Sequence, residues 1–412
     1  MVDRRNAHIA DRVSHLVGDR PYAIGDKQPC PHYPDCVGCT LIGTPYGAQL
    51  RIKRERVAEA FRPFATLAGV AVPEVIGSPR AFGYRNQSKL VVRRTRRELL
   101  LGIYRPGSHQ VVDIRQCPVH HPLIARVLDA LPRLIERHDI STYDERTHAG
   151  SLRYIVVRVS TWTKQAQVIG VTAQRHATGL HELARGLRRV PGVVSVVQNV
   201  NGSPGNAVFG EQFIALTPVT TLTERIGSLR LKTSAGAFLQ ANVPVGRKLY
   251  QEALAWLEPS ADDTVVDLHS GVGALTFCLA TAARHVFGIE ASPIAVADAK
   301  TNVRLNGFHN VRFIQGDAAV ALAQLAQRLP RVDALALNPP RKGTDEACRR
   351  AIVAAHPQRL VYVSCDPGSL ARDLDWFAVH GYPTRRVQPF DMMPQSEHVE
   401  CIAELVRAGR AL

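Results

Sequence analysis

The sequence predicts an α/β protein in two parts: an N-terminal α+β domain over residues 1–240, and a C-terminal domain over residues 241–412 built on a mostly parallel sheet. Three observations support this prediction. In the C-terminal part, short apolar segments alternate with longer helical segments, as in a parallel sheet covered on both faces. The N-terminal part mixes strand-like and helical segments without that alternation. The whole excess of positive charge lies before residue 241.

The charge distribution separates the two parts functionally. The 412 residues include 51 Lys and Arg against 36 Asp and Glu, a net charge of +15. Residues 1–240 hold 33 basic and 18 acidic side chains, whereas residues 241–412 hold 18 of each. We therefore expect the N-terminal part to face a polyanion and the C-terminal part to carry charge-neutral chemistry. A local basic peak interleaved with strand-like apolar residues fits phosphate binding, with a solvated basic face as the alternative; it comprises Arg80, Arg85, Lys89, Arg93, Arg94, Arg96 and Arg97.

Composition excludes several classes of protein. No apolar run approaches the roughly 20 residues that cross a bilayer, and the start MVDRRNAHIADRVSHL lacks the apolar core of a secretion signal. Eight Cys are too few for a disulfide scaffold in so long a chain. We expect a cytoplasmic protein with no membrane partner and no obligate protein partner. Its cysteines should be reduced, so metal binding and catalysis are the special roles that remain for them.

The N-terminal elements are justified by periodicity and turn signals. A basic helix is expected from about Tyr46 to Phe64, and strands within residues 75–117 are separated by turns that contain glycine. A helix with apolar Leu123, Val127 and Leu131 follows. Further strand-like runs are Tyr154–Val159, Ala166–Thr172, Val193–Gln198 and Ala207–Phe209.

The C-terminal elements begin with a helix near Pro244. Five buried strands are expected at Thr264–Leu268, Val286–Ile289, Val311–Ile314, Asp333–Leu337 and Leu360–Ser364. Ligands of such sheets bind beyond the carboxyl ends of the strands. The motifs of this half fall at those ends.

The first strand ends in a glycine turn typical of nucleoside binding. In VVDLHSGVGALT, Gly271 and Gly273 allow close approach to the backbone. Glu290 closes the next strand, where a carboxylate can accept hydrogen bonds from ribose hydroxyls, and Asp317 closes the third, where it is placed to face an adenine. A buried tight turn is the structural alternative.

The fourth strand ends in a rigid loop, Asn338–Gly343, because consecutive prolines cannot continue a central strand. It resembles the Asn-Pro-Pro-aromatic loop of amino-directed nucleic-acid methyltransferases, with Arg341 in place of the aromatic residue. Amino methylation is therefore an alternative function.

The fifth strand ends at Cys365, directly before a helix that Asp366 caps and Pro367 begins. A helix N-terminus lowers a thiol pKa, so Cys365 is predicted to be a nucleophile, whereas Cys278, Cys348 and Cys401 are interpreted as buried apolar residues. Near the C-terminus, alternation is expected to place His398 and Glu400 on one strand face.

The remaining cysteines form a separate set in the N-terminal part: Cys30, Cys36 and Cys39 are clustered and Cys117 is distant. This spacing favours a four-iron cluster over zinc, because zinc ribbons usually pair two short Cys loops. Four protein ligands leave no open iron, so a structural role is expected.

Taken together and in order, the motifs resemble the class I, S-adenosyl-L-methionine-dependent RNA uracil-5-methyltransferases, which modify 23S rRNA or the T-loop of tRNA. The resemblance extends from Cys30 to Val406. Besides the cysteine set, it rests on YRNQSK, LRYIVVR, VQNVN, FGEQF, FLQAN, NPPRKG, SCDPGSLARDL and PFDMMPQSEHVE.

The resemblance implies a Rossmann-like class I methyltransferase domain with a mostly parallel seven-stranded sheet, preceded by an RNA-binding α+β domain with an iron-sulfur cluster. It implies a [4Fe-4S] cluster on Cys30, Cys36, Cys39 and Cys117, nucleophile Cys365 and base Glu400. The methyl-donor contacts it implies, together with Gly271 from the glycine turn, are Gln240, His269, Glu290, Asp317 and Asn338.

The expected substrate is 23S rRNA, because the cluster-free bacterial tRNA branch lacks these cysteines; tRNA is the alternative. This chain departs from its relatives at four positions, Asn338 (often Asp), Asp366 (usually Asn), Ser270 (often Cys) and Ala274. The departures at Asn338 and Ala274 support a rival of another class, an RNA-binding metalloprotein without catalytic activity.

Overall fold

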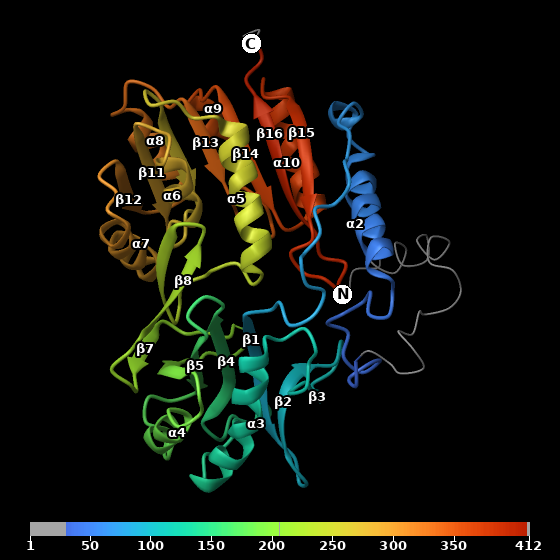
Figure 1. The fold of residues 1–412 in the computed structure, drawn as a ribbon, viewed down its shortest axis with the longest axis vertical. Coiled ribbons are helices and arrows are strands. Elements are labelled where there is room, and N and C mark those ends of the chain that lie inside the picture. Colours follow the sequence, from blue (N-terminus) through green and yellow to red (C-terminus); the bar gives the residue numbers. More distant parts are fainter. Residues whose placement is uncertain (1–29, 206, 410–412) are drawn as a thin grey trace. The chain divides into compact units, whose positions relative to one another are not determined.

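The computed structural model describes residues 30–205 and 207–409, which divide into two compact units (Figure 1). The C-terminal unit contains Thr40–Pro79 and residues 243–409, and the central unit contains residues 30–39 and Arg80–Asn242. The division after residue 242 lies next to the expected one, but Thr40–Pro79 joins the C-terminal unit instead of the N-terminal domain. The reason is apolar burial, since Val57, Phe61 and Leu67 enter the core of the C-terminal unit.

The C-terminal unit is built on a seven-stranded sheet in the order β12-β11-β10-β13-β14-β16-β15. The first five strands pair in parallel and β16 is antiparallel to both neighbours, which confirms the mostly parallel sheet. The order reverses between β10 and β13, where ligand crevices form. The strands are β10 (Thr264–Leu268), β11 (His285–Glu290), β12 (Val311–Gln315), β13 (Ala334–Leu337), β14 (Arg359–Ser364), β15 (Thr384–Phe390) and β16 (Glu400–Val406).

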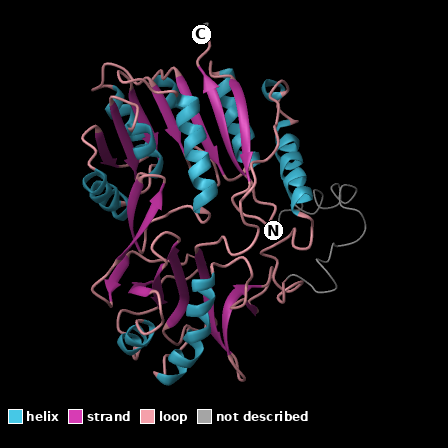
Figure 2. Ribbon diagram, viewed as in Figure 1, coloured by secondary structure: helices cyan, strands magenta, loops and turns pink. Residues whose placement is uncertain are grey.

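Helices cover both faces of this sheet. One face packs against α2, α8, α9 and α10 in a single apolar core, and α5 and α6 lie across the other face (Figures 1 and 2). In the described part of the chain, no helix combines the length and apolar character required to traverse a membrane. The helices are α2 (Tyr46–Phe61), the short η1 (Ala65–Leu67), α5 (Val243–Leu257), α6 (Ala274–Ala280), α7 (Pro293–Asn306), α8 (Ala318–Ala326), α9 (Glu346–Ala354) and α10 (Pro367–Val379).

The central unit has its own seven-stranded sheet, in the order β3-β2-β1-β4-β5-β6-β7. All neighbours are antiparallel except β5 and β6. Helices α3 (Pro122–Arg137) and α4 (Leu180–Leu187) share one apolar core with this sheet. Its strands are β1 (Gln87–Arg94), β2 (Leu99–Tyr104), β3 (Val111–Asp113), β4 (Leu152–Ser160), β5 (Gln165–Thr172), β6 (Val193–Val200) and β7 (Gln212–Ala215), followed by the hairpin β8 (Thr221–Ile226) and β9 (Leu229–Ser234).

The strand expected at Ala207–Phe209 is wrong, because the described strand of this region is β7. The side-chain amide of Asn201 donates to the carbonyls of Ala207 (2.6 Å) and Val208 (3.2 Å). These carbonyls are therefore satisfied by a side chain, and this segment needs no neighbouring strand.

Candidate active site

The loop after β10 is shaped by glycine and fastened to the next strand. Gly271 and Gly273 have φ angles of +55° and +93°, which residues with a side chain rarely adopt. A Cβ atom on Gly273 would lie 2.7 Å from the rings of Phe277 and Phe313. The N–H of Gly271 donates to the Glu290 carboxylate over 3.0 Å. Glycine at 273 is therefore required by the packing of the two rings, and the loop is fixed in place by Glu290.

Glu290 combines this structural bond with free acceptor capacity. Its Oε2 accepts from Gly271, and its Oε1 accepts from the N–H of Ser292 over 2.8 Å. Each carboxylate oxygen has a second lone pair, so hydrogen bonds to ribose hydroxyls remain available. By contrast, Asp267 is buried beneath the loop and accepts from the Thr276 hydroxyl (2.6 Å). Burial raises the pKa of Asp267 to about 7. Because Thr276 belongs to α6, its hydrogen bond to Asp267 anchors this helix beneath the loop.

Other residues expected at the methyl donor gather at the same sheet edge. Burial lowers the pKa of His269, and the negative charges of Glu290 and Asp317 act in the opposite direction, so these three side chains are neighbours. Asp317 is exposed and caps α8. Asn338 follows β13, and its N–H donates to the carbonyl of Leu268 over 3.3 Å.

Gln240 belongs to the other unit. It is buried there, and its backbone carbonyl accepts a hydrogen bond from the side-chain amide of Asn86 over 3.1 Å. Its contact with the methyl donor stays a prediction.

Cys365 and Glu400 come together through strand pairing. In the antiparallel pair of β14 and β16, Ser364 is opposite Cys401, so the next positions outward are Cys365 and Glu400. An electrostatic effect also indicates that the two side chains are close: in addition to burial, the charge of Glu400 raises the pKa of Cys365. Glu400 is buried and Cys365 is half-buried. A thiol and a carboxyl group thus meet at the carboxyl end of β14.

The expected lowering of the Cys365 pKa is wrong in direction. Asp366 caps α10 by accepting from the N–H of Ser369 (2.8 Å), and Pro367 begins that helix, as expected. Nevertheless burial and the charge of Glu400 raise the thiol pKa, and the positive charge of Arg341 offsets only part of the increase. Desolvation outweighs the helix terminus here.

The sequence analysis did not predict that Arg341 lies near the Cys365 thiol. The structure shows this proximity, because the charge of Arg341 acts on the pKa of Cys365. One of its guanidinium nitrogens lies 3.0 Å from Nδ1 of His398. His398 is exposed and precedes β16, whereas Glu400 is buried at its first position. The expectation that both share one strand face is therefore wrong, because the strand begins only at Glu400.

The loop 391–397, which leads into Glu400, is clamped by helix α2. Lys53 and Asp391 form an ion pair with both side chains fully buried. Lys53 also donates to the carbonyl of Met393 over 2.9 Å, and the Tyr46 hydroxyl donates to Asp391 over 2.8 Å. The start of the loop is thus fixed by a buried polar network.

The second half of the loop is fixed from the same helix. Gln49 and Gln395 exchange two hydrogen bonds, 3.0 Å between their side-chain amides and 2.9 Å from the Gln395 N–H. Gln395 has φ +71°, unusual for a residue other than glycine. Arg56 pairs with Glu397 over 2.9 Å. Four residues of α2 form this clamp: Tyr46, Gln49, Lys53 and Arg56. The sequence analysis did not detect it, because its interactions join positions about 340 residues apart.

The four cysteines of the N-terminal set lie near one another in the central unit. Burial raises the pKa of Cys39, and the charges of Cys117, Cys36 and Cys30 add to the increase. All four thiols are free of disulfides. Within residues 30–205 and 207–409, no group of three or more His, Cys, Asp or Glu side chains has the arrangement that holds a metal ion. Four thiols are the donors that an iron-sulfur cluster takes, but the described arrangement is not that of a metal site, and ligation stays a prediction.

Comparison with known proteins agrees with this geometry. Residues 45–408 match the family model of tRNA (uracil-5-)-methyltransferase. The chain is 45% identical over 407 residues to an uncharacterized RNA methyltransferase of Geobacter sulfurreducens, covering 98% of this chain and 82% of that protein. It is 35% identical over 395 residues to an uncharacterized RNA methyltransferase of Halalkalibacterium halodurans, covering 96% of this chain and 86% of that protein.

A solved structure gives the same result. The tRNA (uracil-54, C5)-methyltransferase of Pyrococcus abyssi, in complex with S-adenosyl-L-homocysteine, aligns with a TM-score of 0.71 at 26% identity. The alignment covers 90% of this chain and 86% of that one. The α/β class I methyltransferase fold and the family resemblance are therefore confirmed. The chain belongs to the tRNA (uracil-5-)-methyltransferase family of RNA methyltransferases.

Proposed function

We propose that this protein transfers a methyl group from S-adenosyl-L-methionine to C5 of a uridine in 23S rRNA, with action in the cytoplasm. The observation that carries the proposal is the apposition of Cys365 and Glu400 at the carboxyl end of β14. The reaction needs this pair of groups, because uracil C5 is a weak nucleophile and its proton must later be removed.

In the proposed mechanism, Cys365 Sγ forms a bond to uridine C6, which makes C5 enolate-like. When bound, S-adenosyl-L-methionine would supply an electrophilic methyl group; its transfer to C5 would break the bond between that methyl group and the sulfonium sulfur and leave S-adenosyl-L-homocysteine. Glu400 then removes the C5 proton, and the electron pair of that C–H bond re-forms the C5–C6 double bond as the thiolate leaves. The target base must leave its stack to reach the thiol. Arg341 favours the thiolate by its charge.

The proposed donor site is the sheet edge at β10–β13. Glu290 accepts hydrogen bonds from the ribose, and Gly271 lets the donor approach the backbone. His269, Asp317 and Asn338 line the same edge. The donor contact of Gln240 is implied by the family resemblance, and we keep it as a separate prediction.

The choice of 23S rRNA rests on the cysteine set, whereas the Pyrococcus abyssi neighbour, a tRNA enzyme, supports tRNA. We propose to incubate the protein with radiolabelled methyl donor and either 23S rRNA or total tRNA from a strain that lacks the gene. Incorporation into 5-methyluridine of rRNA alone supports the proposal, and incorporation into tRNA alone contradicts the substrate. RNA binding without methylation of either indicates the inactive metalloprotein.

The pH dependence should follow Glu400. Burial raises its pKa to about 7, so the base form, and with it the release of methylated RNA, increases as the pH rises through 7. Below that pH, the methylated covalent adduct should accumulate. We expect Glu400→Gln to accumulate adduct at every pH and to lower turnover roughly 100- to 10,000-fold. Rapid quenching followed by denaturing gels measures both quantities.

The stability of the same variant provides a control. A carboxyl group with a folded pKa above its ordinary 4.5 contributes stability below about 4.5, which is lost as the pH rises through about 7. Glu400→Gln should therefore lose less stability than the wild type over this interval. A variant that releases its adduct as fast as the wild type would exclude Glu400 as the base.

We also propose that Cys30, Cys36, Cys39 and Cys117 hold a structural [4Fe-4S] cluster, on the basis of their mutual proximity. Protein purified without oxygen should be brown and contain roughly four iron atoms per chain. Cys39→Ser should lower iron content and melting temperature, while Cys278→Ser should leave the iron content unchanged. Stoichiometric zinc without iron would contradict the cluster.

A further inference from the structure

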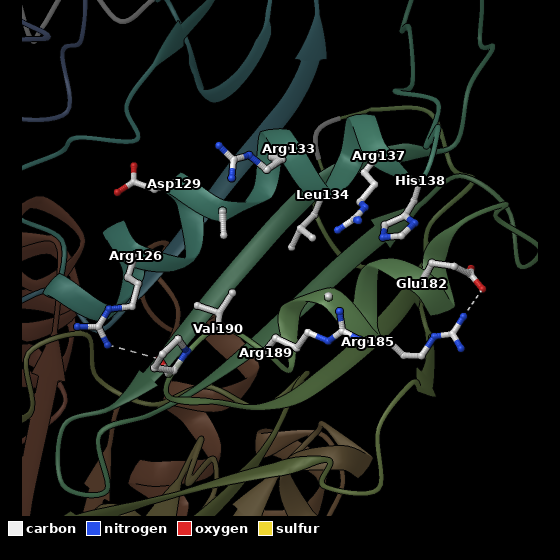
Figure 3. Close-up of a pocket in the computed structure, with 13 residues that line it drawn as sticks. Arg126, Asp129, Arg133, Leu134, Arg137, His138, Glu182, Arg185, Arg189 and Val190 are labelled. Atoms are coloured by element: carbon white, nitrogen blue, oxygen red, sulfur yellow. Dashed lines mark hydrogen bonds and ion pairs between the residues drawn. The ribbon is translucent and has the colours of Figure 1, made fainter.

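An open groove of about 850 Å³ lies between helices α3 and α4 of the central unit (Figure 3). The helices approach closely at Gly186, where a Cβ atom would lie 2.6 Å from Leu134. Leu134 and Val190 contribute apolar lining. The polar lining is dominated by five arginines against one aspartate and one glutamate: Arg126, Arg133, Arg137, Arg185, Arg189, Asp129 and Glu182.

Most of this positive charge is uncompensated. The Glu182 carboxylate pairs with Arg185 at 2.8 Å, with the Arg185 side chain largely exposed and the Glu182 side chain about half exposed. Arg126 reaches the carbonyl of Pro191 at 3.5 Å. Among the described residues, Arg133, Arg137 and Arg189 form no ion pair within 4.0 Å, and all three are exposed. Their guanidinium groups are therefore available to an external anion.

The geometry favours a polymer over a small anion. Arg126 and Arg137 are separated by about 16 Å along α3, at 1.5 Å per residue. Arg133 and Arg137 are one helical turn apart on α3, at i, i+4 spacing. On the other side of the groove, Arg185 lies on α4 and Arg189 lies in the turn that follows it. A single phosphate would be served by fewer groups in a more enclosed site, whereas two rows of exposed guanidinium groups match successive backbone phosphates.

We propose that the α3–α4 groove binds the phosphate backbone of the RNA substrate outside the target nucleotide. This inference rests on the proposed function for the identity of the RNA, and it concerns a surface formed by the central unit alone. RNA is favoured over an acidic protein because Arg133 and Arg137 on one side of the groove and Arg189 on the other form no ion pair among the described residues, a spread of charge suited to a continuous line of phosphates.

The test is equilibrium binding of a 23S rRNA transcript to full-length protein over a series of salt concentrations. Arg133→Gln/Arg137→Gln/Arg189→Gln should weaken binding roughly tenfold or more at low salt, and should reduce the slope of log affinity against log salt by about 2 to 3. The matched control is Arg146→Gln/Arg175→Gln/Arg328→Gln, which removes the same charge from exposed positions outside the groove. We expect the control to change the slope by less than about one unit.

A gain of affinity gives a second readout. Asp129→Asn/Glu182→Gln removes the two acidic side chains of the groove and should tighten RNA binding and steepen its salt dependence. Methylation by the arginine variant should show a raised KM with unchanged kcat, since no groove residue lies in the proposed catalytic machinery. Equal binding by the groove and control triples overturns the proposal. A different outcome is that the arginine variant loses RNA affinity while the wild type methylates no uridine. This result supports the groove and rejects the proposed function.

Discussion

Replacing Cys365 with serine should lower uridine methylation by roughly a thousandfold or more. A serine hydroxyl has no neighbouring group that ionises it at neutral pH, so it cannot add to uridine C6 at a useful rate. The thiol itself has a raised pKa, so it is mostly protonated near pH 7. Cysteine tolerates this because even a small thiolate fraction is strongly nucleophilic.

The measurement is methyl transfer together with covalent trapping. RNA that contains 5-fluorouridine cannot lose its C5 substituent as a proton, so the wild type should form a complex that survives denaturation in the presence of the methyl donor. Cys365→Ser should form none and should still bind RNA. Cys278→Ser, at a partly buried thiol that the proposed chemistry does not use, should retain methylation. Methylated adenine or guanine, formed at an undiminished rate by Cys365→Ser, would instead support the amino-directed alternative.

Replacing Lys53 with methionine should cost about 3–5 kcal/mol of unfolding free energy. The substitution leaves the Asp391 carboxylate buried without its cation, since both side chains are fully buried in the wild type. The cost of an unpaired buried charge exceeds the value of the pair itself, because the carboxylate cannot regain its hydration. Urea unfolding of the full-length chain, monitored by circular dichroism, measures the loss.

Two further variants separate this effect from general damage to α2. Arg62→Gln breaks a largely exposed pair with Glu55 at 3.3 Å, and its cost should stay below about 1 kcal/mol. Lys53→Met/Asp391→Leu removes both charges and should recover most of the lost stability. A Lys53→Met protein as stable as the wild type would contradict the importance of the buried pair.

The same network connects α2 to catalysis. The loop 391–397 is fixed by Lys53 and Gln49 and ends three residues before Glu400. A partly folded Lys53→Met protein should therefore retain adduct longer than its folded fraction explains, because the base is less well placed.

Local sequence patterns predicted much of the fold because helices and strands reflect short-range periodicity. The strand at Thr264–Leu268 has the expected bounds, and the helix expected near Pro244 is α5. The failures involve distant partners. The segment at Ala207–Phe209 resembles a strand locally, but its carbonyls bond to the Asn201 side chain. The turn before Glu400 could not be recognised, because residues of α2 fix it.

The sequence by itself determined the order of the elements, the chemical types at the strand ends and the family to which they belong. The glycines, carboxylates and cysteine at those ends can be recognised in the sequence because each follows its own strand directly. Only the tertiary structure decided that Glu400 lies beside Cys365, that Thr40–Pro79 joins the C-terminal unit, and that the thiol pKa is raised. The physical reason is that burial and strand register arise from contacts between segments far apart in the chain, whereas periodicity and capping depend only on near neighbours.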